Sequence, residues 1–350
     1  MTNYDDMKCA VEALSGGKNT VILDDIGMPS IMVPVPKMKY SDLITGGTQD
    51  TLPAFIVGGG EIPVVYASKY QNIVVNDRAY SLAYKDPRAN ITFDAALAAC
   101  RKKGAGWHLQ TNALWGALVN WCYKNGTPPH GNSNYGAAYG YAHEKAVPSM
   151  ALDGSGRVQR TATGSGPVTW YHDHTGSGIA DLCGNVWEWV AGLRTVYGEI
   201  QIIPYANAMM ADCDMSETST EWKAIKPDGS LVDPGTSGTL KFDYISNKIT
   251  ISTSVTTSSG SVNTALKDIA AASGVTIPQL LVALGLAPDS AFTYGGDMVY
   301  VNPAEAERFP DRGAGWYHTS NAGVGALYLN NPRGVSGANL GFRAAYYETL

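Results

Sequence analysis

The chain has 350 residues, with 25 Lys and Arg against 31 Asp and Glu, which gives a formal net charge of −6. This length fits one large domain or two to three modest ones. The acidic balance and the lack of a long basic run argue against a nucleic-acid-binding protein, and no run of 18 apolar residues predicts a membrane-spanning helix. The 39 Gly, 20 Tyr and 8 Trp are typical of a loop-rich fold studded with aromatic residues.

The first six residues have neither a basic head nor an apolar core, so we expect no signal peptide and synthesis in the cytoplasm. The five cysteines show no Cys-x-x-Cys spacing. They are therefore predicted to be mostly buried thiols, which suits a reducing compartment.

Residues 1–50 are predicted to form an N-terminal β-rich arm. Two β-rich runs, at residues 19–27 and 30–36, are separated by a Gly-Met-Pro turn. An equally good alternative is a strand that packs on the main domain.

Residues 51–227 are predicted to form the first part of the main domain. The sequence indicates short strands at residues 54–60, 62–66 and 72–76, and Pro63 favours an edge position for the second of them.

Two helices are expected to follow these strands. The first is capped by Thr92 and ends at Gly104, and the second is capped by Thr111 and ends at Gly126. Apolar residues at helical spacing, namely Leu114, Trp115 and Leu118, form the inward face of the second helix.

Residues 228–298 are interpreted as an insertion that contains a hairpin and short helices. The runs at residues 240–244 and 248–251 alternate around a Ser-Asn turn, which predicts the hairpin. Short helices are expected near residues 265–270 and after Thr276, which is predicted to cap the second. A surface decoration is the favoured role, and packing beside a binding face or between subunits is the alternative. Residues 299–350 complete the main domain.

Four segments carry a family resemblance: Gly-Ile-Ala-Asp-Leu-Cys-Gly-Asn-Val-Trp-Glu-Trp at residues 178–189, Arg-Gly-Ala-Gly-Trp at 312–316, Asn-Ala-Gly-Val at 321–324 and Asn-Leu-Gly-Phe-Arg at 339–343. In this order they resemble the formylglycine-generating-enzyme branch of the C-type lectin fold. Within that branch they are most similar to the variable proteins of diversity-generating retroelements. The resemblance implies an α+β C-type lectin fold with an N-terminal arm and an inserted subdomain.

The enzymes of this branch bind copper through two cysteines, and here the matching positions hold His318 and Gly323. Copper(I) selects soft thiolate ligands, which neither residue supplies. The formylglycine-generating type of copper oxidase is therefore disfavoured. The sequence contains no Gly-x-Ser-x-Gly nucleophile motif. We predict a protein that is not an enzyme.

The resemblance implies instead a variable binding surface in the C-terminal region. Randomising the two adenines that begin an asparagine codon produces Tyr, His, Thr, Gly, Val and Ala but never a stop codon, and that mixture occurs here. Tyr and His each combine an apolar body with a polar tip, as binding loops require. An ordinary Tyr- and Gly-rich loop is the plain alternative. The predicted ligand-binding positions are Tyr317, His318, Thr319, Gly325, Tyr328, Val335, Gly337, Ala338 and Asn339.

The residues between these positions are interpreted as scaffold. They are Trp316, Ala322, Gly323, Val324, Leu327, Leu329, Pro332, Arg333, Gly341, Phe342 and Arg343. Arg343 is expected to pair with a buried carboxylate or carbonyl.

A calcium site is also implied by the resemblance, at Asp181 and Glu188 with the carbonyl oxygens of Gly184 and Val186. Carboxylates and backbone oxygens are the ligands of a hard cation. The favoured alternative has Trp187 and Trp189 filling the core while Glu188 hydrogen-bonds a loop. We expect that binding requires no cofactor, with calcium as the ion that the resemblance allows.

The predicted function is therefore the binding of a protein or other surface ligand by a diversified surface. A phage or prophage origin would place the protein on a virion or cell surface, and a homo-oligomer is compatible with this. The remaining alternative is a purely structural phage tail protein.

Overall fold

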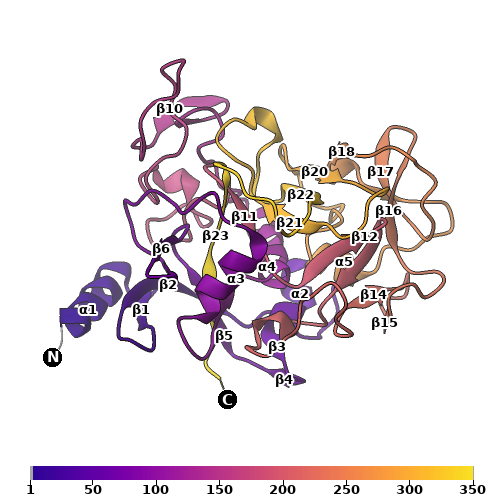
Figure 1. The fold of residues 1–350 in the computed structure, drawn as a ribbon, viewed down its shortest axis with the longest axis horizontal. Helices are drawn as coiled ribbons and strands as arrows, with labels where there is room; N and C mark the ends of the chain where they lie inside the picture. The colour runs from indigo at the N-terminus through magenta and orange to yellow at the C-terminus, as the bar shows by residue number, and fades with distance from the viewer. Residues whose placement is uncertain (1–2, 350) are drawn as a thin grey trace.

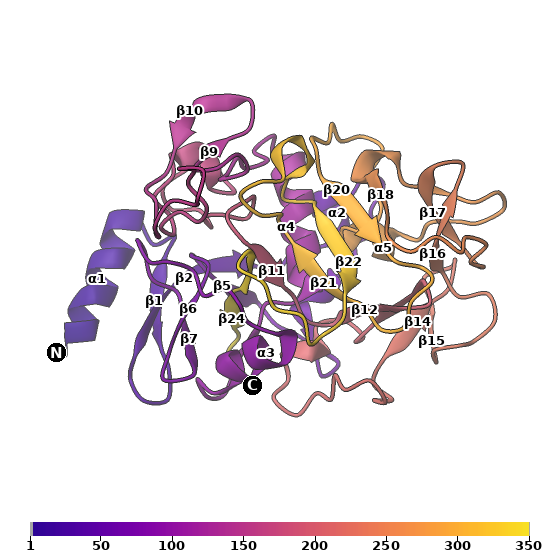
Figure 2. The same cartoon turned by 45° about the horizontal axis from the view of Figure 1, so that its top comes forward.

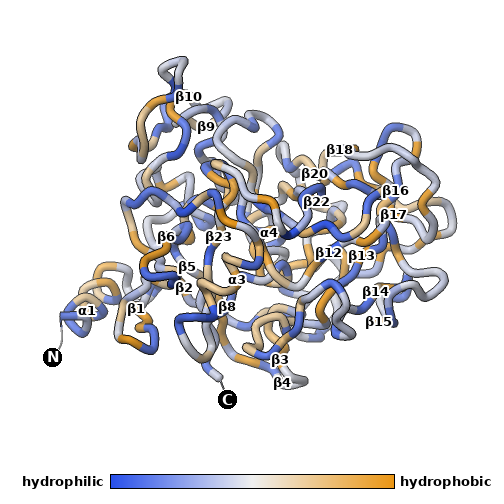
Figure 3. Tube along the Cα trace, in the orientation of Figure 1, coloured by the Kyte–Doolittle hydropathy of each residue, from blue (hydrophilic) through white to orange (hydrophobic). Residues whose placement is uncertain are grey.

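The structure is a computed structural model, and it describes residues 3–349. It is a mixed α+β fold built on three sheets (Figure 1), in agreement with the α+β class predicted from the sequence. Hydrophobic and hydrophilic residues alternate along much of the chain (Figure 3), as half-buried strands and loops require.

The first sheet joins the two ends of the chain. Its five strands are antiparallel and run in the order β1 (Thr20–Leu23), β2 (Pro29–Pro36), β5 (Val64–Ser68), β24 (Ala344–Tyr346) and β8 (Trp107–Leu109). The C-terminal strand β24 thus lies between two strands from the first third of the chain. Residues 20–36 are part of this sheet, which is the packed alternative to an arm. Val64 pairs with Pro36, so Pro63 precedes an inner strand and the expected edge position is wrong.

The second sheet carries most of the C-terminal region. Its strands run in the order β18 (Val262–Ala265), β20 (Met298–Val301), β22 (Leu327–Asn331), β21 (Phe309–Arg312), β11 (Trp187–Trp189) and β23 (Leu340–Phe342). The segment interpreted as an insertion contributes β18, which pairs with β20. That segment therefore contributes a strand to the same sheet as the predicted variable region.

The third sheet lies at the other end of the molecule from α1 (Figures 1 and 2). The predicted hairpin is present as β16 (Lys241–Ile245) and β17 (Lys248–Ser252). The remaining strands of this sheet are β12 (Leu193–Val196), β13 (Glu199–Ile202), β14 (Lys223–Ile225), β15 (Leu231–Val232) and β19 (Ala270–Ala271).

Three short ribbons complete the strands. They are β3 (Ile56–Val57) with β4 (Gly60–Glu61), β6 (Ile73–Val75) with β7 (Arg78–Tyr80), and β9 (Ala137–Ala138) with β10 (Tyr141–Lys145). The single strand expected at residues 54–60 is replaced by the η1 turn at Pro53–Phe55 and by the short hairpin of β3 and β4.

The two predicted helices form with their predicted caps. Thr92 accepts a hydrogen bond from the Ala95 amide at the start of α3 (Phe93–Arg101). Thr111 does the same with the Leu114 amide at the start of α4 (Asn112–Lys124). Gly126, at φ +68°, adopts the left-handed backbone that ends the second helix.

The other helices depart from the sequence expectations. Helix α1 (Asn3–Ser15) buries no residue and projects from the body (Figure 2), where only an extended arm was expected. Helix α5 (Gln279–Ala283) begins after Pro278, so Thr276 is not its cap. The remaining helical segments are α2 (Tyr40–Leu43) and the 3-10 turns η1 (Pro53–Phe55), η2 (Val168–Trp170), η3 (Asn207–Met209), η4 (Leu266–Asp268) and η5 (Thr319–Asn321). The helix expected near 265–270 is only the η4 turn between two strands.

Two hydrophobic clusters form the core. One surrounds α4, whose Leu114, Trp115 and Leu118 are buried as predicted. The other surrounds α3 and the second sheet, where the Phe93 ring lies 4.3 Å from that of Phe309. No helix within residues 3–349 has the length and apolarity that a membrane span requires.

Candidate functional site

Five aromatic side chains from β11, β20, β22 and the loop after β21 form a connected group, and we call this group the aromatic face. It comprises Trp187, Tyr300, Tyr317, His318 and Tyr328. Tyr317 is 43% exposed, and His318 and Tyr328 are half-buried. Three of the predicted variable residues thus lie together with two aromatic residues from outside the variable region.

Ring contacts hold the aromatic face together. The Tyr317 and His318 rings are stacked with centroids 4.5 Å apart. Trp187 meets His318 edge-on at 5.0 Å and Tyr328 at 5.7 Å, and Tyr328 lies 5.3 Å from Tyr300. Because Tyr328 and Tyr300 are paired residues on neighbouring strands, β22 and β20, part of the face rests on rigid backbone.

His318 is held in its neutral form. Its Nε2 accepts a hydrogen bond from the Trp187 indole at 3.3 Å, since an indole nitrogen only donates. The other ring nitrogen, Nδ1, lies 3.1 Å from the Gly315 amide nitrogen and 3.3 Å from the Gly315 carbonyl oxygen, and it can donate to that oxygen when it carries the ring proton. Burial lowers the pKa of His318. Protonation of Nε2 would set two N–H groups against each other, so it would loosen this part of the face.

Asn339 connects the aromatic face to the scaffold. Its side-chain amide donates to the Tyr317 hydroxyl at 2.9 Å, and its carbonyl oxygen accepts from the Trp187 amide at 2.8 Å. On the other side, Asn321 donates to the Tyr300 hydroxyl at 3.3 Å. Both contacts position a tyrosine hydroxyl at the surface.

Thr319 opens the η5 turn with a backbone φ of +52°. A β-branched residue is strained in this left-handed region, which asparagine tolerates far better. Its amide donates to the Ser133 carbonyl at 2.8 Å, which ties the turn to a neighbouring loop.

Gly325 is buried, which removes it from any exposed surface. Its amide donates to the Asp297 carboxylate at 2.7 Å. A Cβ built on Gly325 would lie 3.0 Å from both Asp297 Oδ1 and Leu266 Cδ2. Its assignment as a ligand-contacting position is therefore corrected, because the packing around it leaves no room for a varied side chain.

The last three predicted positions lie on the loop before β23. Val335 is half-buried and packs against the second core cluster. Gly337 is also half-buried, and its carbonyl accepts from the Asn90 amide. Ala338 is exposed, while its carbonyl accepts from Arg160 at 2.9 Å. This loop is anchored through its backbone, which leaves the Ala338 side chain open to solvent.

The residues interpreted as scaffold are mostly inside. Trp316 is 5% exposed and Phe342 is fully buried. Val324, Leu327 and Leu329 are buried as well. Pro332 departs from this pattern, since it is exposed.

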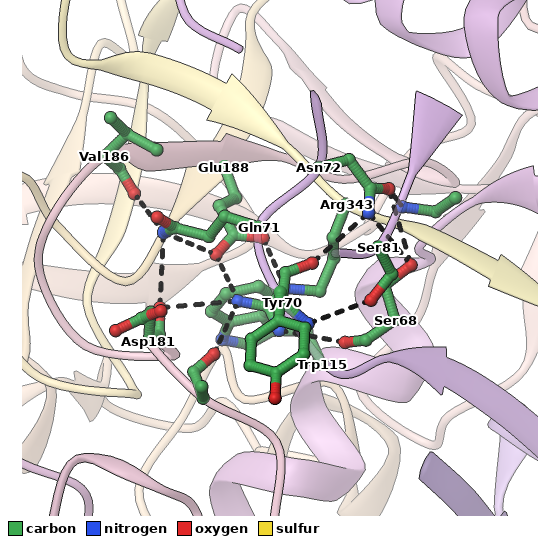
Figure 4. Close-up of polar contacts among 12 residues, drawn as sticks. Ser68, Tyr70, Gln71, Asn72, Ser81, Trp115, Asp181, Val186, Glu188 and Arg343 are labelled. Carbon is green, nitrogen blue, oxygen red and sulfur yellow. Dashed lines mark hydrogen bonds and ion pairs between the residues drawn. The ribbon is translucent and has the colours of Figure 1, made fainter. Parts of the chain in front are cut away.

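The oxygens that would hold calcium converge on a protein amide instead (Figure 4). Gln71 Nε2 lies 2.9 Å from Glu188 Oε1 and 3.2–3.5 Å from the carbonyl oxygens of Val186, Asp181 and Gly184. Two N–H groups thus stand where a hard cation would need room.

Arg343 takes up the rest of the Glu188 carboxylate (Figure 4). Its Nε and an Nη each lie 2.6 Å from a Glu188 oxygen, and both side chains are buried. Arg343 therefore pairs with a buried carboxylate as predicted, and Trp189 fills the core beside it.

Asp181 points elsewhere. Its carboxylate accepts from the Gly164 amide at 2.8 Å, and burial raises its pKa to about 6. The arrangement of Asp181 and Glu188 thus does not fit a bound cation. Within residues 3–349, no group of three or more His, Cys, Asp or Glu side chains is placed to hold a metal ion.

Sequence reasoning missed three contributors to the site. Trp187 was assigned to the core alone, although its indole also supports His318. Tyr300 lies outside the variable region and gave no signal beyond its place in a β-rich run. Asp297 was assigned to the insertion, yet it anchors the backbone of the variable loop.

Comparison with known proteins gives fold-level likenesses. No protein-family model matches the chain, and no curated protein matches it. Among solved structures, it is similar to variable protein 1 of Treponema denticola, with 12% identity, a TM-score of 0.35 and coverage of 94% of this chain and 98% of that one. PvdO from Pseudomonas aeruginosa is 14% identical, with a TM-score of 0.36 over 93% and 97% of the two chains. The U1 variant of the Major Tropism Determinant is 11% identical, with a TM-score of 0.31 over 94% of this chain and 71% of that one.

These three neighbours match at least 93% of this chain, at identities of 11–14%. Their TM-scores lie below 0.5, so the assignment of function rests on the residues of this chain.

Proposed function

We propose that this chain is a ligand-binding protein that displays a diversified surface on a C-type lectin scaffold. The observation that carries the proposal is the aromatic face. Tyr317, His318 and Tyr328 sit on a layer of fully or nearly buried residues such as Trp316 and Leu327. Aromatic side chains lose little conformational entropy on binding, so a rigid group of them is suited to contact another molecule.

The chemistry of the face supports binding over catalysis. His318 occupies one of the two positions that the copper enzymes use for cysteine, and its Nε2 is taken up by the Trp187 indole. Gly323, at the other position, packs against Asp297 so closely that a Cβ would lie 2.0 Å from Oδ1. A thiolate at either place would require repacking, which disfavours the oxidase.

The natural ligand is proposed to be a protein or another molecule on a cell surface. A phage or prophage origin would place this chain on a virion or cell surface, where several copies of one chain would increase the overall affinity. An adenine-rich near-copy of the segment encoding residues 316–343, beside a reverse-transcriptase gene, is the genomic arrangement expected for such a protein.

Two matched libraries test the proposal. In the first, Tyr317, His318, Tyr328 and Ala338 are randomised, and in the second, Trp316, Leu327, Leu329 and Phe342 are. We expect the first library to remain largely folded and to yield binders to immobilised target proteins, whereas the second loses folded protein. Binders whose affinity maps to residues 228–298 would refute the assignment of the face.

A further inference from the structure

A cleft of about 440 Å³ opens beside the aromatic face. One wall is the loop of residues 128–141, and the other is formed by residues 293–296 and the η5 turn. Val324 and Cys183 line its interior. Thr319 and Ser320 line this cleft and directly follow His318 of the aromatic face along the chain.

The lining of the cleft carries no carboxylate, ammonium or guanidinium group. Among the described residues that form it, none is Asp, Glu, Lys or Arg, although the chain as a whole is acidic. The titratable side chain His130 is already bonded through Nδ1 to Glu144 at 2.9 Å. A charged ligand group would lose its hydration here without gaining a partner of opposite charge.

Aromatic rings make up both walls. His130 and Tyr141 are stacked at 3.9 Å on one side, and Tyr123 and Tyr294 lie 4.4 Å apart on the other. Tyr139 is 50% exposed at the rim.

The hydroxyls of the inner pair are already engaged. The Tyr123 hydroxyl donates to Asp297, and the Tyr294 hydroxyl accepts from the Asp289 amide at 2.9 Å. The Tyr294 hydroxyl acts only as an acceptor in this contact, and both rings offer their surface to the cleft.

Close backbone contacts fix the shape of the cleft. A Cβ on Gly131 would lie 1.7 Å from the Cys183 carbonyl oxygen, and one on Gly296 would lie 1.8 Å from that of Ser320. Both walls are thus packed backbone to backbone against their neighbours, so the cleft exists before a ligand arrives. A preformed cleft avoids the cost of ordering its walls on binding.

We propose that the protein partner inserts an uncharged aromatic side chain, carried on a protruding loop, into this cleft. This inference rests on the proposed function and assigns to the same site an anchor that diversification leaves largely unchanged. The aromatic face would then contact the partner residues around the inserted side chain. The cleft would contribute binding affinity that is common to all sequence variants of the face. One buried aromatic residue in a pocket is the usual core of such an interface.

The test uses the full chain and small probes of defined chemistry. Methyl NMR spectra are recorded with N-acetyl-L-tyrosinamide, N-acetyl-L-phenylalaninamide, the α-amide of N-acetyl-L-glutamate, and methyl α-D-mannopyranoside. We expect the two aromatic amides to shift the Val324 methyl signals with saturable, weak affinity. The glutamate probe and the mannoside should leave those signals in place.

Variants of exposed residues show whether the probes bind in the cleft. Tyr139→Ala is expected to weaken the affinity for the aromatic probes by roughly tenfold, which is the upper range for the loss of one aromatic contact. Tyr84→Ala, at a tyrosine that is 65% exposed and outside the cleft lining, is the matched control and should change nothing. Thermal unfolding of both variants confirms that the comparison is between folded proteins.

Three outcomes would overturn the inference: no probe shifts Val324, the mannoside alone shifts it, or the glutamate probe binds as well as the aromatic ones. The proposed function is judged separately by Tyr317→Ala, which should weaken partner binding but not probe binding. If Tyr317→Ala loses partner binding but no probe binds the cleft of the original protein, the proposed aromatic anchor is wrong. The proposed binding role of the aromatic face would still stand.

Discussion

Glu188 and Arg343 form a buried ion pair that joins two sheets of the molecule. Glu188 lies on β11 of the second sheet, and Arg343 lies between β23 of that sheet and β24 of the first. The Arg343 guanidinium also donates to the Ser68 carbonyl at 3.1 Å, at the end of β5. The pair therefore fixes the C-terminal segment that follows the predicted variable region.

Removing one partner of this pair should be costly. Glu188→Leu leaves the Arg343 cation buried without its carboxylate, and we expect a loss of about 3–5 kcal/mol in the free energy of unfolding, measured with urea. The exposed pair of Lys37 and Glu61 is the control, and Glu61→Gln should leave stability nearly unchanged. Similar losses in both variants would contradict the role given to the buried pair.

The division between scaffold and displayed residues predicts unequal effects of truncation. Phe342→Ala should cost about 3–5 kcal/mol, since it removes a fully buried ring. Tyr317→Ala should cost only about 0.5 kcal/mol, since an exposed ring is lost. Tyr328→Ala should fall between them because its half-buried ring contacts Trp187 and Tyr300. Thermal unfolding ranks the three variants, and equal losses would remove the basis for the division.

Thr319 offers a stabilising substitution. Thr319→Asn keeps a polar side chain but relieves the strain at φ +52°, so we expect a gain of about 1 kcal/mol. Thr319→Val remains β-branched and should bring no gain. Calorimetry of the two variants is the measurement, and a stability of Thr319→Asn at or below that of the original protein would show that the turn does not favour asparagine.

Stability should fall on mild acidification. Burial lowers the pKa of His108 and of His172 to about 4, below the ordinary value of 6.5. The unfolded chain therefore binds protons first, so stability is full above pH 6.5 and is lost as the pH falls toward 4. Each histidine contributes on the order of 2–3 kcal/mol to this loss.

Asp181 acts in the opposite direction, because its raised pKa of about 6 favours the folded state as the pH falls from 6 to 3.8. Burial also raises the pKa of Asp297 and of Asp311, which act in the same direction as Asp181. The lowered pKa values of carboxyls such as Asp24 and Asp243 act with the histidines, so we expect the net stability to fall as the pH falls.

Urea unfolding from pH 7.5 to 4 measures how the free energy of unfolding depends on pH. His108→Asn should reduce this dependence, and the exposed control His143→Asn should leave it unchanged. A stability that rises steadily toward pH 4 would refute this balance.

The hydrogen bonds of Gln71 predict that calcium does not change the thermal stability of the protein. Since the amide nitrogen occupies the point where the oxygens converge, neither calcium nor EDTA should shift Tm. Gln71→Ala should cost about 1–3 kcal/mol, because buried acceptors lose their donor. A Tm of the original protein that rises with calcium concentration would show that the ion displaces Gln71.

The sequence was most informative where the signal was local. Thr92 and Thr111 cap their helices as predicted, and the Ser-Asn turn produces the hairpin of β16 and β17. Capping and turn formation depend on residues a few positions apart, so one sequence is sufficient to reveal them.

Long-range relationships could not be predicted in this way. Asp297 contacts Gly325 from 28 residues away, and Tyr300 reaches Tyr328 across two strands that pair in parallel. Gly325 looked like a surface position because small residues mark both open loops and tight packing. Helix α1 was missed, although Tyr4, Met7 and Val11 recur at helical spacing and are half-buried.

The place of β24 in the first sheet has a consequence for synthesis. Strands β5 and β8 acquire their shared neighbour only when residues 344–346 are available. The first sheet can therefore close only after residues 344–346 have left the ribosome, so the first third of the chain cannot complete this sheet by itself. Any premature stop within residues 316–343 would leave that sheet open between β5 and β8.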